Sequence, residues 1–109
     1  MNLVEKVFYN TQTNEKTIEK VIIDDNVHYL HLVFPKGDGL PIHQSNANMY
    51  MTVIRGLLSI GLNNNDTQIY TKGTVLNIPC NTTMNVRNEN EDILELIIVK
   101  TPVPGKSCV

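Results

Sequence analysis

Short apolar runs separated by turn residues extend over the whole chain, and this pattern is the feature that most constrains the fold. The runs are rich in Val, Ile, Leu, Thr and Tyr, which favour β-strands, whereas helical periodicity is hard to find. The sequence therefore predicts an all-β protein. The predicted strands are Leu3–Tyr9, Thr17–Ile23, Val27–Phe34, Met49–Ile54, Leu57–Leu62, Thr67–Tyr70, Thr74–Ile78, Thr83–Val86 and Ile93–Lys100.

The breaks between these runs contain residues suited to tight turns. Asn, Asp and Gly recur in the segments 24–26, 35–39, 63–66, 72–73 and 88–92, and they tolerate left-handed or side-chain-capped turn conformations. The segment NNND at 63–66 predicts a hairpin between the two runs that flank it. Short strands at this spacing in 109 residues are typical of a sandwich or barrel.

The size and charge of the chain limit the classes of function. With 109 residues it is long enough for one domain with a buried core and too short for two. A net charge of −2 gives no field that attracts nucleic acid or an anionic membrane, so we expect neither as a partner. No segment resembles a signal peptide or reaches the length of a membrane span, and we expect a cytoplasmic protein.

The chain contains two cysteines, Cys80 and Cys108, and neither belongs to a CxxC pair. In a reducing compartment we expect two unpaired thiols, with Cys80 as a small buried side chain and not a nucleophile. The closing segment 101–109 contains two prolines. We expect it to leave the domain as an extended tail.

Two of the predicted strands carry apolar residues on both faces. They are MYMTVI at 49–54 and ILELIIV at 93–99. Because successive side chains of a strand point to opposite faces, such strands need cover on both sides. A second copy of the chain is the simplest source of an outer layer, so the sequence predicts a homodimer.

Residues 37–56 resemble the first motif of the cupin family. The spacing of the motif is kept at Gly37, His43 and Gly56. Ser45 and Met49 stand where cupins usually have His and Glu. This segment therefore keeps the frame of a metal-site loop and lacks two of its ligands.

Residues 73–88 resemble the second cupin motif, with Gly73 and Pro79 in place and with Asn81 and Met84 where Gly and His are usual. The resemblance implies a double-stranded β-helix, or jelly-roll barrel, as a single domain over 1–109 with a tail from about 101. It also implies a pocket between the two sheets and frequent dimers. The family includes isomerases, dioxygenases, epimerases, storage proteins and sensor domains, so the fold does not give the function.

The resemblance places four side chains at the family's metal-ligand positions, namely His43, Ser45, Met49 and Met84. One imidazole does not hold a divalent ion usefully, so we expect no cofactor. His28 and His31 lie three apart on one predicted strand, so they face opposite sides and at most one could join His43. A transition metal stays an alternative, because His43, Met49 and Met84 form the soft ligand set that Cu(I) selects.

Strand alternation from the ligand positions predicts the walls of the pocket. Met49, Met51 and Val53 would point inward and meet Met84 and Val86 of the second motif. His43, with Ser45 near it, would be the main polar feature. Apolar walls with a few polar groups are typical of a site for a small organic molecule, and they are equally typical of a filled interior.

Three hypotheses for the function follow. The first is a metal-independent protein that binds or senses a small molecule, with His43 as its polar anchor. The second is a cupin-type enzyme, such as an isomerase or dioxygenase, in which His43 is an acid or base or belongs to an atypical metal site. The third is a structural dimer without a ligand.

Glu95 and Arg55 are interpreted as solvent-facing charges.

Overall fold

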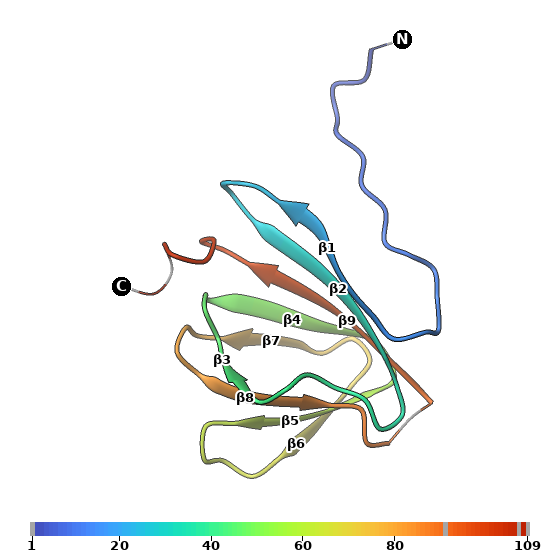
Figure 1. The fold of residues 1–109 in the computed structure, drawn as a ribbon, viewed down its shortest axis with the longest axis vertical. Helices are drawn as coiled ribbons and strands as arrows, with labels where there is room; N and C mark the ends of the chain where they lie inside the picture. Colours follow the sequence, from blue (N-terminus) through green and yellow to red (C-terminus); the bar gives the residue numbers. More distant parts are fainter. Residues whose placement is uncertain (1, 91, 107, 109) are drawn as a thin grey trace.

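A computed structural model describes residues 2–90, 92–106 and 108 of the chain. It is all-β, as predicted (Figure 1). Its described residues include no helix of the length and apolarity that a membrane span needs. The strands are β1 (Thr17–Ile23), β2 (His28–Pro35), β3 (His43–Gln44), β4 (Met49–Arg55), β5 (Leu57–Leu62), β6 (Gln68–Thr71), β7 (Val75–Ile78), β8 (Thr83–Arg87) and β9 (Ile93–Lys100).

The strands form two antiparallel sheets. One has the order β1-β2-β9-β4-β7 and the other the order β3-β8-β5-β6. Strands that are distant in the sequence pair closely, as β2 and β9 do from His28↔Lys100 to Pro35↔Ile93. This topology is the predicted double-stranded β-helix.

The core lies between the two sheets and is filled by alternate residues of their strands. On β4, Met49, Met51 and Val53 are buried, whereas Tyr50 between the two methionines is exposed on the outer face. Burial of each such large side chain contributes about 1.5–3 kcal/mol. The core cluster consists of Leu32, Phe34, Met49, Met51, Val53, Leu58, Ile60, Ile78, Met84, Val86, Leu94, Leu96 and Ile98.

Two residues with left-handed backbone conformation explain parts of the motif pattern. Gly56, between β4 and β5, has a φ of 80°, and a Cβ there would overlap the Ile93 carbonyl oxygen. Asn81 has a φ of 65°, and asparagine is one of the few residue types other than glycine that adopts this conformation readily. Asn81 therefore keeps the backbone turn for which cupins usually have glycine.

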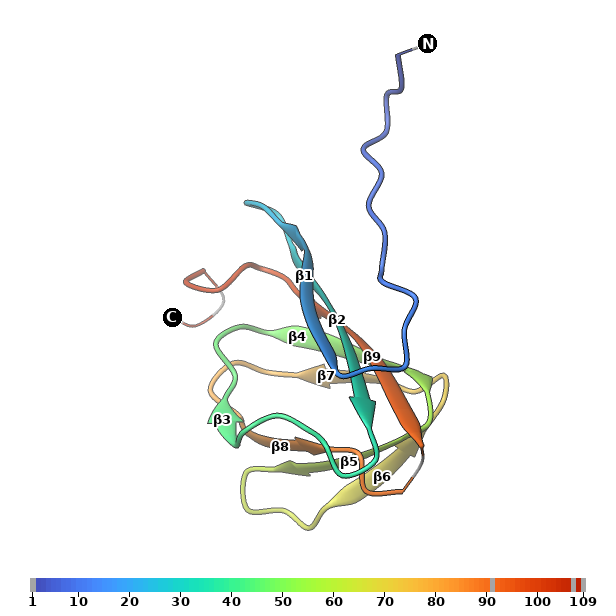
Figure 2. The same cartoon turned by 45° about the vertical axis from the view of Figure 1, so that its right-hand side comes forward.

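The predicted hairpin at 63–66 is confirmed, since β5 and β6 pair from Leu57↔Thr71 to Ile60↔Gln68. The predicted strand Leu3–Tyr9 is wrong, because this segment extends away from both sheets (Figures 1 and 2). Residues with a high strand propensity form a strand only when a neighbouring strand offers hydrogen-bond partners to their backbone. The short strand β3 was missed, because its two residues form a strand only through pairing with β8.

Candidate functional site

The two motif segments lie side by side at one edge of the four-stranded sheet. β3 pairs with β8, which places His43 opposite Met84. The His43 side chain is nevertheless exposed, and its Nδ1 lies 2.9 Å from the Pro41 carbonyl oxygen. The expectation of His43 as the polar group of an enclosed pocket is wrong, because β3 is a two-residue edge strand and leaves the ring exposed.

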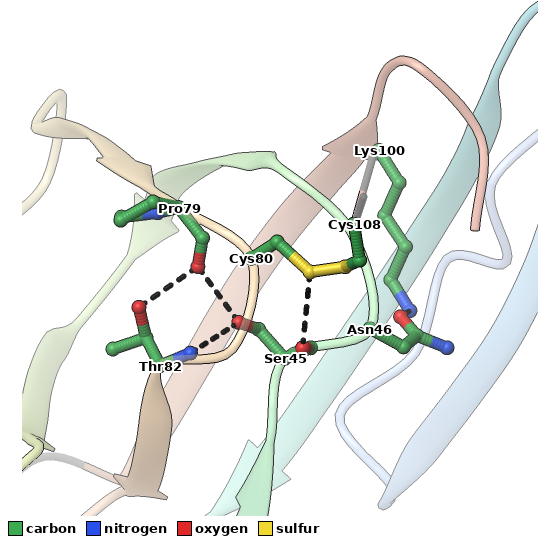
Figure 3. Close-up of a disulfide and its surroundings, with 7 residues drawn as sticks. All are labelled: Ser45, Asn46, Pro79, Cys80, Thr82, Lys100 and Cys108. Atoms are coloured by element: carbon green, nitrogen blue, oxygen red, sulfur yellow. Dashed lines mark hydrogen bonds between the residues drawn. A yellow bond between two sulfur atoms is a disulfide. The ribbon is translucent and has the colours of Figure 1, made fainter. Parts of the chain in front are cut away.

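Ser45 is buried and connects the first motif to the second (Figure 3). Its hydroxyl donates to the Pro79 carbonyl oxygen at 2.7 Å and accepts from the Thr82 backbone N–H at 2.9 Å. Its backbone N–H donates to the Thr82 carbonyl oxygen, and its carbonyl oxygen accepts from the Asn81 N–H. The Ser45 hydroxyl is therefore used within the protein, where a cupin with a metal would have an imidazole.

The loop after Ser45 is also fixed to the end of β9. The Lys100 ammonium donates to Asn46 Oδ1 at 2.8 Å (Figure 3), and burial lowers the pKa of this lysine. Asn48 and Thr101 exchange two hydrogen bonds, one through the Asn48 side chain and one through its carbonyl oxygen. These contacts hold the motif loop closed over the end of the core.

The apolar walls of the predicted pocket face the interior. Met49, Met51, Met84 and Val86 are each at most 2% exposed and belong to the core cluster, so their predicted inward alternation is confirmed. These side chains pack against one another. The pockets beside Arg55, beside Gly56 and beside Leu62 are lined by other residues. Their contact with a ligand stays a prediction.

The residues at the family's metal-ligand positions do not fit a metal. His43 is exposed and its Nδ1 lies against the Pro41 carbonyl oxygen, the Ser45 hydroxyl donates to a carbonyl, and the thioethers of Met49 and Met84 lie in the core. The soft ligand set is therefore divided between an exposed imidazole and two thioethers that pack in the core. In the described part of the chain, no group of three or more His, Cys, Asp or Glu side chains is placed to hold an ion.

The cysteines differ from expectation. Cys80 and Cys108 form a disulfide with a Cα–Cα distance of 5.6 Å (Figure 3), so the prediction of unpaired thiols is wrong. Residues 107 and 109 of the predicted tail lie outside the described residues. For the described part, the prediction of an extended tail is wrong, since Val103 is buried and the Lys106 N–H donates to its carbonyl oxygen in a turn. Cys108 thus lies beside Cys80, a proximity that sequence spacing does not reveal.

A cluster of charged side chains lies on the outer face of the five-stranded sheet. His31 of β2 is fully buried, with Nδ1 2.9 Å from Glu19 Oε1 and Nε2 2.6 Å from Glu95 Oε2. Arg55 Nε donates to the other oxygen of Glu95 at 2.8 Å. Strand register produces this arrangement, because His31 pairs with Glu19, and Glu95 pairs with Arg55. Both ring nitrogens can donate together only in the protonated imidazolium.

Hydrogen bonding favours the ionised form of both carboxylates. The side chain and backbone N–H of Thr11 donate to Glu19 and, with His31, hold the pKa of this carboxyl below its ordinary value. Burial alone would raise the pKa of Glu95, but the bonds from His31 and Arg55 outweigh it, and the pKa is lowered. Both carboxylates of the cluster are therefore ionised near neutral pH.

A pocket of about 440 Å³ lies beside this cluster, lined by Gln12, Thr13, Asn14, Arg55 and Glu95. Arg55 donates through its two terminal nitrogens to Asn14 Oδ1 at 2.9 Å and to the Thr13 carbonyl oxygen at 3.0 Å. Its side chain is still 40% exposed, and that of Glu95 is 18% exposed. The pocket thus presents a fixed cation and a fixed anion to solvent.

The interpretation of Arg55 and Glu95 as solvent-facing charges missed this cluster. Strand alternation does predict the face on which Glu95 lies. Its neighbours Leu94 and Leu96 belong to the core, so Glu95 must lie on the outer face. Its partner His31, however, is 64 residues away in the sequence and lies on a different strand. Only the sheet order brings them together.

The sheet topology and the two motif segments define a protein with a double-stranded β-helix fold, whose usual ligand positions hold structural side chains. No family model matches the sequence. An uncharacterised protein of Methanocaldococcus jannaschii is 32% identical over 105 residues, which cover 95% of this chain and 90% of that protein. Its crystal structure, described as an RmlC-like cupin family protein with a double-stranded β-helix fold, superposes with a TM-score of 0.91 over 96% of this chain and 97% of that chain. The chain therefore belongs to the RmlC-like cupin family.

More distant structures share the fold alone. A cupin-like protein of Thermotoga maritima has a TM-score of 0.72 at 22% identity, over 79% of this chain and 68% of that chain. A cupin superfamily protein of Desulfitobacterium hafniense has a TM-score of 0.71 at 11% identity, over 84% and 82%. These two structures show that the same fold forms from very different sequences.

Proposed function

We propose that this cupin is a metal-independent protein that binds or senses a small polar molecule in the pocket between Arg55 and Glu95. The observation that carries the proposal is the pair of fixed, partly exposed opposite charges in a pocket of about 440 Å³. A volume of this order is typical of small-molecule sites. The proposed site lies on the outer face of the sheet, and the interior between Met49 and Met84 serves as the core.

The charges indicate the chemistry of the ligand. Each terminal nitrogen of Arg55 makes one bond within the protein, and each has a second N–H that can donate to a carboxylate or phosphate. The Glu95 oxygens can accept from a hydroxyl or amino group. A small hydroxy acid, amino acid or sugar phosphate carries both kinds of group.

A thermal-shift screen with these three compound classes tests the proposal. A ligand at ten times its Kd contributes about 1.4 kcal/mol and should raise the melting temperature by about 5–10 °C. Arg55→Gln should abolish the shift. Arg87→Gln is the matched control, because Arg87 makes a similar pair with Glu89 on the other sheet. The proposal fails if no compound raises the melting temperature, or if a shift persists in Arg55→Gln.

The filled interior favours a second candidate, a structural dimer without a ligand.

The enzyme hypothesis has less support, since the His43 ring contacts a backbone carbonyl and is exposed. Activity that survives His43→Ala would remove this residue as a catalyst. Elemental analysis of the purified protein addresses the metal, because a stoichiometric transition metal contradicts the proposal.

We also propose a cytoplasmic location, and the disulfide makes this proposal testable. Disulfides are rare in most cytoplasmic proteins, which are kept reduced by thiol systems. Alkylation of cells at the moment of lysis should therefore trap Cys80 and Cys108 as thiols if the protein is in the cytoplasm. A fully oxidised pair after trapping contradicts a reducing location.

A further inference from the structure

The disulfide lies partly exposed at the end of the barrel where the two motif segments meet (Figure 3). Cys80 belongs to the turn between β7 and β8, and Cys108 belongs to the segment after β9. Both residues are only half-buried. Cys80 Sγ lies 3.8 Å from the carbonyl oxygen of Ser45 in the first motif. A disulfide that solvent reaches is open to attack by a thiolate, and exposed disulfides are the labile ones.

The Cys80 side of the bond is held by contacts that do not involve sulfur. The Asn81 N–H donates to the Ser45 carbonyl oxygen at 3.0 Å. The Thr82 N–H donates to the Ser45 hydroxyl at 2.9 Å. These bonds connect the two motif segments directly, so the turn that carries Cys80 should keep its position when the S–S bond breaks.

The Cys108 side is held differently. Val103 is buried, and its carbonyl oxygen accepts from the Lys106 N–H at 3.0 Å. Beyond Val103, both Gly105 and Lys106 are exposed. The disulfide then fixes Cys108 to the body of the protein. Breaking this bond therefore lets Lys106 and Cys108 move away from the barrel, while the turn that carries Cys80 stays in place.

We infer that Cys80 and Cys108 form a site of reversible thiol–disulfide exchange, which fastens the C-terminal segment to the barrel when oxidised and releases it when reduced. The reactants are a small thiol, RSH, and its disulfide, RSSR. One thiolate attacks the protein disulfide and forms a mixed disulfide, and the other cysteine leaves as a thiolate. A second thiolate attacks the mixed disulfide and releases RSSR. The protein gains two electrons and two protons, two RSH are oxidised to one RSSR, and closure is the reverse reaction.

This inference agrees with the location proposed above and does not depend on the ligand pocket. In a reducing compartment, the disulfides that do form are usually transient and redox-sensing. The pair would then stand open as two thiols and close under oxidising conditions. Neither cysteine lines the pocket beside Arg55, so a failure of the ligand screen leaves this inference standing.

A redox titration of the full wild-type chain tests the exchange. The folded protein is equilibrated with graded ratios of reduced to oxidised glutathione, free thiols are alkylated, and the modified thiols are counted by mass. We expect the pair to change from disulfide to dithiol within the series, with the same end point from either starting state. A bond that stays closed in excess reduced glutathione is a structural crosslink and overturns the inference. Thiols that do not pair in excess oxidised glutathione, or that end as mixed disulfides with glutathione, also overturn it.

Amide hydrogen exchange by NMR tests the release of the segment. The Lys106 N–H should exchange at least about tenfold faster in the dithiol form, because its turn is then no longer fixed by the disulfide. The Asn81 N–H, which bonds to the first motif, should keep its exchange rate. The Asp38 N–H is the matched control, because it donates to the Pro35 carbonyl oxygen in a turn of the same spacing, also at 3.0 Å, at the far end of β2. An unchanged Lys106 rate, or a faster rate at all three amides, contradicts a local release.

The variant Cys108→Ser removes the bond and keeps a side chain of similar size. Its Lys106 amide should exchange rapidly in both reduced and oxidised glutathione. A redox response of this amide that persists in the variant overturns the inference, because the cysteine pair would not be its source. Thermal melting verifies that the variant is folded, and Cys80→Ser, which removes the same bond from the other side, replaces it if it is not.

Discussion

The His31 cluster leads to the sharpest prediction, because this histidine is fully buried between two carboxylates. His31→Leu keeps an apolar group of similar size and removes both hydrogen bonds. Bonds to charged groups contribute about 1.5–3 kcal/mol each. Glu19 and Glu95 have side-chain exposures of 26% and 18%, so water can partly replace the ring. We therefore expect a loss of about 2–4 kcal/mol at pH 7.

Urea unfolding measures this loss, and the midpoint should fall by about 1–3 M. His28→Leu is the control, because His28 is half-buried on the opposite face of β2 and should change stability by less than about 0.5 kcal/mol. A loss in His31→Leu no larger than in His28→Leu would refute the reasoning.

The pH dependence provides a second measurement on the same pair of proteins. The pKa values of Glu19 and Glu95 are lowered from the ordinary value of 4.5. Their contribution to stability is therefore complete above pH 4.5 and is lost as the pH falls through the lower values of the folded state. The wild type should lose stability steeply in this acid range. His31→Leu should lose less, because part of the lowering disappears with the ring, and an unchanged acid slope would contradict the account.

Three further substitutions test other parts of the structure by the same unfolding assay. Ser45→Ala removes a hydroxyl that serves both Pro79 and Thr82, and a loss of about 1–3 kcal/mol is expected; no loss would show that water replaces the hydroxyl. Met51→Ala leaves a cavity in the core and should cost about 2–5 kcal/mol, whereas a loss below about 1 kcal/mol would indicate an interior that is not tightly packed. Cys108→Ser opens a disulfide whose cysteines are 28 residues apart, and the lost loop constraint amounts to at most about 3–4 kcal/mol. Equal stability of the Cys108→Ser and wild-type proteins under oxidising conditions would show that the crosslink does not constrain the unfolded chain.

The fold was predictable because local patterns and the spacing of the motifs agree with it. Strands β1, β5 and β9 have the predicted bounds, since each is an apolar run between strong turn residues. The N-terminal segment 2–10 has a similar composition but pairs with no strand among the described residues. Composition predicts which residues are able to form a strand, and pairing decides whether they do.

The candidate site was less predictable. The motif frame correctly located the loop that contains His43 and Ser45, and alternation correctly placed Met49, Met51, Met84 and Val86 inside. The exposure of the His43 ring depends on its position at a sheet edge, which no local pattern gives. The pocket at Arg55 and Glu95 requires the segment 12–14 to fold over the outer face, and the sequence contains no signal for that contact.

By itself, the sequence determined the all-β class, the order of most strands along the chain and the identity of the side chains that alternate into the core. These properties follow from period-two patterning and turn chemistry, which act over a few residues. Only the tertiary structure decided that His31 is enclosed by Glu19 and Glu95, that Cys80 meets Cys108, and that the N-terminal segment 2–10 extends away from both sheets. Each of these results depends on sheet order and register, which bring together residues that local sequence patterns do not relate.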